Sequence, residues 1–128
     1  QLDLLAKYEG TESYVIMDWK RSKEIKYDNS FQKMLPPLTH LDECNFNTYS
    51  LQLNMYKYIL ESEYDIHVDE LYLAIFHESH EMPVVIQVSE MAIEVTSIVN
   101  FEKEQRNARD PQVGAHAPFV VDHIMNLS

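Results

Sequence analysis

A strand–helix–strand pattern limits the folds that this sequence can adopt. Residues 14–20 and 70–76 are two largely apolar runs of strand length, and residues 47–63 between them have the apolar periodicity of a helix. Two strands joined through a helix are expected to lie parallel, with a right-handed crossover. Because residues 14–17 and 71–76 are continuously apolar, we expect both strands to be central and covered on both faces.

Shorter elements extend this pattern on both sides. Residues 1–8 are predicted to form a strand that turns near Gly10 and pairs antiparallel with the 14–20 strand. Residues 84–88 are predicted to form a further short strand. A connection as long as residues 20–45 is uncommon in a compact domain, so we expect part of it to be functional or to form a short helix.

A second helix is predicted to begin with Ser89 as its cap and to end near Arg109, before Pro111. The predicted fold class is therefore α/β, with a mixed central β-sheet flanked by α-helices in a single domain of residues 1–128. The tail, residues 111–128, contains an apolar stretch at 117–127 for which no packing position is predicted.

The first predicted helix, residues 47–63, has a polar residue on its apolar side. The apolar arc consists of Leu51, Leu53, Met55, Tyr58, Ile59 and Leu60, and the opposite face, which we expect to be solvated, of Ser50, Asn54, Lys57 and Glu61. Gln52 falls in the middle of the apolar arc, with Tyr56 one turn later. A buried glutamine without hydrogen-bond partners costs about 1–3 kcal/mol, so this position needs a structural or functional explanation.

The charge distribution bears on possible partners. The formal net charge of −11 opposes binding to nucleic-acid phosphates. Half of the ten basic residues nevertheless lie within residues 20–33: Lys20, Arg21, Lys23, Lys26 and Lys33. Two interpretations stay open for this segment: a local path for phosphate groups, or a solvated charged loop.

Cysteine content and hydropathy bear on the compartment. Cys44 is the only cysteine, so an internal disulfide and a zinc site built on several cysteines are excluded. A reducing, intracellular compartment is expected, whether cytoplasm, nucleus, or a viral or organellar setting. No apolar stretch reaches transmembrane length, so no membrane partner is expected.

Acidic and basic side chains converge at the end of the first apolar strand. Asp18 and Lys20 are two residues apart and point to the same face, and Asp3 lies one hairpin upstream on the neighbouring strand. Two carboxylates on adjacent strands form an oxygen-rich site that suits Mg²⁺ or Mn²⁺, with the Trp19 carbonyl as a further ligand. The alternative is a structural ion pair at the strand end beside a solvated Asp3.

Together with Gln52-x-x-x-Tyr56 on the following helix, Asp3 and Asp18-Trp19-Lys20 resemble the pattern of the PD-(D/E)XK nuclease superfamily. The similarity is greatest to its RecB-type exonuclease branch, which includes mitochondrial genome maintenance and lambda-exonuclease-like enzymes. It covers about residues 1–76 and implies a restriction-endonuclease-like core. Because that core begins with an earlier helix, it also implies that the chain is a fragment of a larger polypeptide that lacks the first core helix.

The resemblance implies a Mg²⁺- or Mn²⁺-dependent nuclease, with DNA as the favoured partner and exonuclease action favoured over endonuclease action. Asp3, Asp18 and the Trp19 carbonyl would hold the metal, and Lys20 would serve the attacking water. Gln52 and Tyr56 would face the active site. Nucleic-acid contacts are expected from Arg21, Lys23, Lys26 and Tyr49. Two alternatives stay open: an inactive nuclease-fold module that binds nucleic acid or protein, and an unrelated acidic interaction domain.

Three other groups of residues are weaker candidates. His77 and His80 have three-residue spacing rather than the four of the helical zinc motif, so a polar loop is favoured, although His77 could approach the carboxyl ends of the parallel strands. Cys44 is expected to be a structural thiol. Asp122 and His123 in the tail could form an acid–base pair, but nothing in the sequence anchors them.

Overall fold

Four strands form one mixed sheet in the order β1-β2-β3-β4 in the computed structural model, which describes residues 3–79 and 81–108. The strands are β1 (Leu4–Lys7), β2 (Ser13–Arg21), β3 (His67–Phe76) and β4 (Val84–Val88). β2 is antiparallel to β1 and parallel to β3, and β4 is antiparallel to β3. The two apolar runs are therefore the central, parallel strands of a mixed sheet, as predicted.

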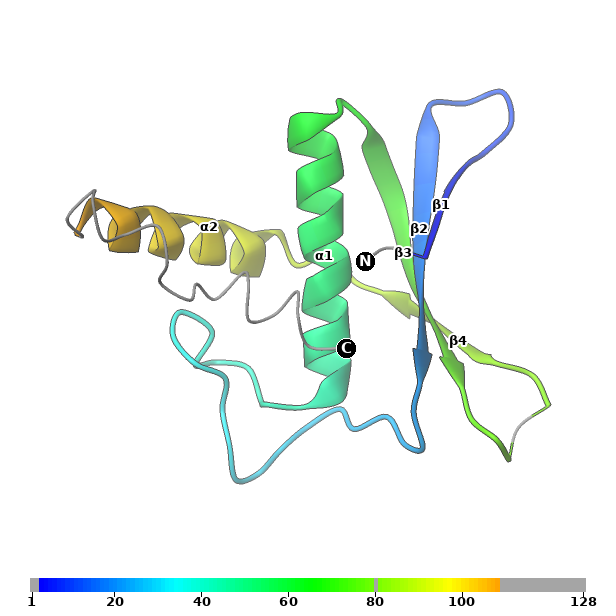
Figure 1. Cartoon of the computed structure of the whole chain (residues 1–128), viewed down its shortest axis with the longest axis horizontal. Helices are drawn as coiled ribbons and strands as arrows, with labels where there is room; N and C mark the ends of the chain where they lie inside the picture. Colours follow the sequence, from blue (N-terminus) through cyan, green and yellow to red (C-terminus); the bar gives the residue numbers. More distant parts are fainter. Residues whose placement is uncertain (1–2, 80, 109–128) are drawn as a thin grey trace.

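Two helices build further layers on one side of this sheet. Helix α1 (Asn45–Glu63) connects the parallel strands β2 and β3, and helix α2 (Ala92–Asn107) follows β4. Figure 1 shows α1 standing between the sheet and α2, so that the sheet, α1 and α2 follow one another as successive layers. The predicted α/β class is confirmed, but α2 does not flank the sheet, because its buried residues pack against α1 instead.

Helix α1 contributes to two separate hydrophobic clusters. The first lies between α1 and the sheet and contains Ile16, Leu53, Val68, Leu71, Leu73, Ile75 and Val88. The second lies on the other side of α1, where α2 and the 22–44 connection meet it, and contains Met34, Leu38, Leu51, Met55, Val95 and Ile98. Burial on two sides explains why all of residues 51–55 are buried.

The prediction of a solvated polar face on α1 is wrong for Ser50 and Asn54, which are both buried. The Asn54 side chain joins α1 to the start of α2: its Nδ2 donates to the Ser89 carbonyl at 3.1 Å, and its Oδ1 accepts from the Met91 N–H at 2.7 Å. Asn54 thereby satisfies a backbone N–H at the α2 N-terminus that would otherwise lack a partner. The polar face packs against protein because a second layer covers it.

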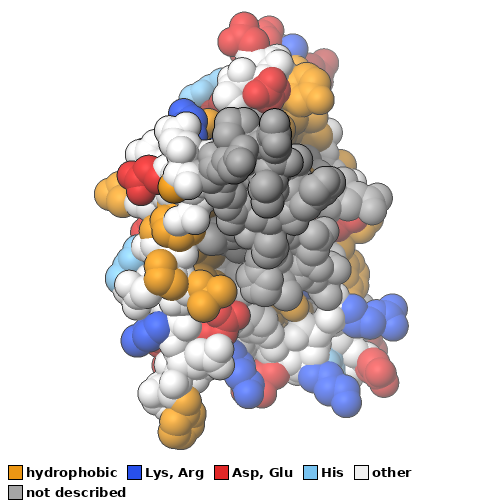
Figure 2. Space-filling view, turned by 60° about the vertical axis from the view of Figure 1, so that its left-hand side comes forward, with side chains coloured by type: hydrophobic (Ala, Val, Ile, Leu, Met, Phe, Trp, Pro, Cys, Tyr) orange, Lys and Arg blue, Asp and Glu red, His pale blue; other side chains and the backbone are white. Residues whose placement is uncertain are grey.

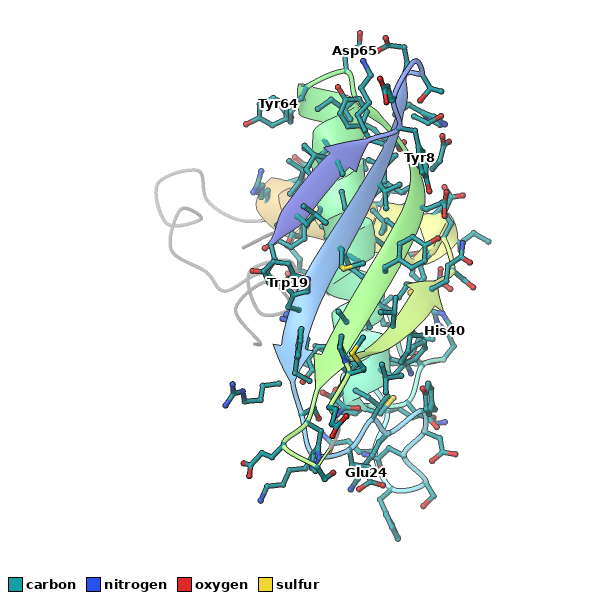
Figure 3. The ribbon with its side chains drawn as sticks, turned by 90° about the vertical axis from the view of Figure 1, so that its right-hand side faces the viewer. Tyr8, Trp19, Glu24, His40, Tyr64 and Asp65 are labelled. Atoms are coloured by element: carbon teal, nitrogen blue, oxygen red, sulfur yellow. The ribbon has the colours of Figure 1, made fainter. Side chains whose placement is uncertain are left out.

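Among the described residues, helices cover only one face of the sheet, so the predicted cover on the second face is not seen in this part of the chain. Ile16 and Asp18 of β2 point toward α1 and are buried, whereas Val15 and Met17 on the opposite face are half-buried. Figure 3 looks onto this opposite face, with α1 behind the strands, and Trp19 on it is 49% exposed.

Several element boundaries also differ from the prediction. β1 is shorter than the predicted 1–8 strand, and Gln1 and Leu2 lie outside the described residues. Ser89 does not cap α2, which begins at Ala92 without a side-chain cap. Predictions for Arg109 and for the tail, residues 111–128, also fall outside the described residues.

The 22–44 connection contains no helix. A backbone bridge between Lys33 and Asp42 closes part of it, and their side chains form an ion pair. Met34 and Leu38 from this segment are buried in the second cluster. The long connection therefore contributes to the hydrophobic core by packing against α1 and α2. Among the described residues, no helix is long and apolar enough to cross a membrane.

Candidate functional site

The candidate site begins at the buried end of β2. Asp18 and Lys20 point toward α1, as their two-residue spacing predicts, because Asp18 follows the buried Ile16 at the same parity. Their side chains are 2% and 11% exposed, and Lys20 Nζ lies 3.1 Å from Asp18 Oδ2. Burying an ion pair this deeply costs desolvation free energy that the attraction between the two charges offsets only in part. A purely structural role therefore does not readily explain the pair.

Asp3 joins this pair from the neighbouring strand. It directly precedes β1, and its Oδ2 accepts a hydrogen bond from the Trp19 N–H at 2.8 Å. Its carboxyl group is also within hydrogen-bonding reach of the Asp18 carboxyl. The structure thus brings together the two carboxylates that the sequence predicted to converge, one exposed and one buried.

The two carboxyl groups divide the charge unequally. Burial, followed by the hydrogen bond to Asp3, raises the pKa of Asp18 to about 6, although Lys20 opposes this shift. The hydrogen bonds from Asp18 and from the Trp19 N–H hold the pKa of Asp3 below its usual value. A proton shared by the pair therefore resides on Asp18, while Asp3 keeps its negative charge.

Helix α1 supplies the other wall of the site. The Lys20 ammonium lies 5.1 Å from the centre of the Tyr49 ring, a cation–π arrangement. Gln52 and Tyr56 follow Tyr49 at positions that share one helix face, and Tyr49 and Tyr56 both pack against the sheet-side cluster. Gln52 is 3% exposed, so the glutamine on the apolar arc is indeed buried.

The predicted phosphate-contacting residues lie beyond this site. Arg21, Lys23 and Lys26 are exposed at the end of β2 and in the connection that follows. In Figure 2, Lys and Arg side chains lie mostly in the lower half of the view, close to acidic side chains. Among the coloured side chains of this face, the basic ones are interspersed with acids.

The donor set fits a divalent cation that prefers oxygen ligands. Asp3 and Asp18 supply carboxylates. The Trp19 N–H donates to Asp3 at the edge of β2 that faces β1. Because the N–H and C=O of one strand residue point to the same side, the Trp19 carbonyl also points toward this edge. Within residues 3–79 and 81–108, no third His, Cys, Asp or Glu side chain joins them.

One polar cluster was not anticipated from the sequence. Tyr8 and Tyr72 both donate their hydroxyl protons to the Glu70 carboxylate, from Tyr8 at 2.8 Å. The hydrogen bond to Glu70 raises the pKa of Tyr72 to about 12. The two-residue spacing puts Glu70 and Tyr72 on one face of β3, but Tyr8 and Glu70 are 62 residues apart and meet only through the sheet, so no local pattern signals the whole cluster.

The structure describes two of the weaker candidates, His77 and Cys44. His77 lies in the loop after β3, where its Nδ1 interacts with the Ser79 backbone N–H at 3.0 Å. His80 lies outside the described residues, as do Asp122 and His123. Cys44 is a buried free thiol at the start of α1, consistent with the expected structural role.

Comparison with known proteins finds no relative of this chain. No protein-family model matches the chain, and neither the curated proteins nor the solved structures include a match.

Replacing Asp18 by asparagine is expected to change the pH dependence of stability in the metal-free protein. The pKa of Asp18 rises from 3.8 to about 6 on folding, so the carboxyl stabilises the fold while protonated and this contribution is lost as the pH rises through about 6. The variant should therefore gain stability over the natural protein, by about 3 kcal/mol, between about pH 4 and pH 7. Urea unfolding at each pH measures this difference, and Asp65→Asn, at an exposed position, is the control. A difference that stays constant with pH would contradict the assignment of the proton to Asp18.

Proposed function

We propose that this chain is a PD-(D/E)XK-type nuclease domain that hydrolyses phosphodiester bonds of nucleic acid, with Mg²⁺ or Mn²⁺ as cofactor. DNA is the favoured substrate, and exonuclease action is favoured over endonuclease action on the resemblance alone. The observation that carries the proposal is the meeting of the Asp3 and Asp18 carboxyl groups, with the Lys20 ammonium 3.1 Å from Asp18.

The arrangement of elements supports this proposal. Asp3 stands at the start of β1, Asp18 and Lys20 stand near the end of β2, and α1 follows with Gln52 and Tyr56. The antiparallel pairing of β1 with β2 brings Asp3 beside the end of β2 that carries Asp18 and Lys20, and the parallel pairing of β2 with β3 fits a crossover through α1. This is the order of elements that the resemblance implies for a restriction-endonuclease-like core.

Each residue has a role that its position makes possible. Asp3, Asp18 and the Trp19 carbonyl would hold the cation, which supplies charge neutralisation at the phosphoryl oxygen and an activated water. Lys20, held against the Tyr49 ring, would position that water and offset the negative charge that develops on the phosphate. Exclusion of bulk water from the α1 side of the site strengthens these charge interactions.

Substrate contacts are assigned to residues outside the carboxylate pair. Gln52 and Tyr56 help to hold the substrate phosphate from α1, and the exposed Arg21, Lys23 and Lys26 offer a path for neighbouring phosphates. The strongly negative net charge makes such a local path necessary, because the remaining surface repels nucleic acid.

A second candidate function is a nuclease-fold module that binds nucleic acid or protein without cleaving it. The observation that favours it is the small ligand set, since only two carboxylates converge among the described residues. Such a module would keep the Asp18–Lys20 pair as a structural ion pair.

Metal titration and cleavage of labelled DNA distinguish these functions. The proposed function predicts that the natural protein binds Mn²⁺ and degrades labelled DNA only when Mg²⁺ or Mn²⁺ is present. Asp18→Asn should lose both properties while remaining folded, whereas Asp65→Asn, which removes an exposed carboxylate, should keep both. Mn²⁺ binding at Asp18 without cleavage of any DNA or RNA would favour the second function. Absence of Mn²⁺ binding would rule out the metal site.

A further inference from the structure

Within residues 3–79 and 81–108, strand β4 forms an outer edge of the sheet and pairs with β3 only. Figure 3 shows it at the right-hand edge of the four strands. Alternate residues of an edge strand point their backbone N–H and C=O groups away from the sheet, where they can pair with another strand. Apart from the ladder with β3, the β4 backbone makes no backbone–backbone hydrogen bond among the described residues.

This edge lacks most of the features that prevent strands from pairing. The stretch of residues 82–89 contains no charged side chain, and Val84 and Val85 are 50% and 53% exposed. Pro83 has no N–H, but it precedes the strand and leaves all five residues Val84–Val88 able to pair. The opposite edge, β1, has only four residues and carries Lys7, a residue typical of protected edges.

The pattern of β4 is complementary to itself. When two copies run antiparallel and Ile86 lies opposite Ile86 of the other copy, Val84 faces Val88 and Val85 faces Gln87 across the new ladder. Val84, Ile86 and Val88 then all lie on the α1 side, next to the sheet-side cluster, which contains Val88 and contacts Ile86. This is the register that pairs the full length of the strand.

From this pattern we propose that β4 is a self-association edge, through which two copies of the chain form one continuous sheet. The symmetric contact is isologous, as in most homodimers. A second copy fits better than an unrelated strand because the edge offers no charge with which to select a different partner. The inference does not depend on the proposed nuclease activity.

The size and charge of this contact set its strength. A five-residue ladder falls short of the roughly 1,200 Å² that stable interfaces bury, so the dimer is weak and depends on protein concentration. Both copies carry a net charge of −11, and Glu81 and Glu90 flank the strand at its two ends. Salt screens this repulsion, so added NaCl should strengthen the association.

Sedimentation velocity over a wide range of protein concentration tests the proposal. The natural protein should shift from monomer to dimer in the micromolar range or above. Val85→Lys places an ammonium on the paired edge and should raise the dimer dissociation constant at least about tenfold. Mixing Val85→Lys with Gln87→Glu should restore part of the association, because the two new charges lie opposite one another in this register.

Leu4→Lys is the matched control on the other edge of the sheet. Leu4 is 39% exposed, and both substitutions make the net charge less negative by one, so general charge repulsion cannot explain a loss seen only with Val85→Lys. Circular dichroism verifies that both variants remain folded. A natural protein that stays monomeric at the highest concentration overturns the proposal. So does an equal loss of association in the two lysine variants, or a mixture that associates no better than Val85→Lys alone.

Discussion

Replacing Lys20 by methionine is expected to reduce metal-dependent cleavage of DNA by roughly 10²–10³-fold. Methionine keeps an unbranched apolar stem beside Tyr49 but removes the ammonium group that lies 3.1 Å from Asp18. Because Lys20 is not a proposed ligand of the cation, the affinity for Mn²⁺ should change by less than about tenfold. Steady-state cleavage of labelled DNA and calorimetric titration with Mn²⁺ measure the two effects separately.

The assay conditions and the control follow from the charges at the site. Lys20 lowers the pKa of Asp18, so its loss raises that pKa further, and cleavage should be measured near about pH 8, where the carboxylate stays ionised. Lys23→Met removes an exposed lysine from the same segment and should change the cleavage rate only slightly. If Lys20→Met cleaves DNA as fast as the natural protein, the proposed role of Lys20 in catalysis is wrong.

Truncating Leu51 or Leu53 to alanine is expected to lower the free energy of unfolding by about 2–5 kcal/mol in each case. Both side chains are fully buried, yet they lie in different clusters: Leu53 packs against the sheet, and Leu51 packs against α2 and the connection. Each truncation leaves a cavity that the packed layers on that side cannot fill. Urea unfolding followed by circular dichroism measures both losses.

Leu35→Ala provides the control, because Leu35 is 65% exposed and its truncation should cost less than about 1 kcal/mol. The Leu51 result carries the most information about the fold. A loss at Leu51 as small as that at Leu35 would mean that α2 and the connection do not pack on α1 in solution, while the Leu53 result would be unaffected.

Much of the sheet and its crossover could be predicted, because apolar periodicity reports directly on which residues avoid water. The runs at residues 14–20 and 70–76 became the central strands β2 and β3, and the helix between them became α1. Periodicity could not reveal the second layer on α1. Ser50 and Asn54 are polar, and the partners of Asn54 at Ser89 and Met91 are 35 and 37 residues away, so their burial depends on tertiary contacts.

The part of the candidate site that depends on local spacing could also be predicted. A hairpin and a two-residue spacing suffice to place Asp3 near Asp18 and to put Lys20 on the same face, and the structure has both. The contact between Lys20 and Tyr49 was not predicted, because it depends on the rotation of α1 over the sheet. The contact of Tyr49 with nucleic acid stays a prediction, and the structure adds that the Tyr49 ring lies beside the Lys20 ammonium.

The two halves of the carboxylate site rest on parts of the fold that differ in their protection from water. Asp18 is anchored in a central strand, but Asp3 is held by β1, whose four residues are all exposed and which, in the part of the chain that the structure describes, pairs only with β2. Such edges open locally far more often than a domain unfolds. Any ligand that needs both carboxylates must keep β1 closed, so its affinity and the amide-exchange protection of β1 are thermodynamically linked.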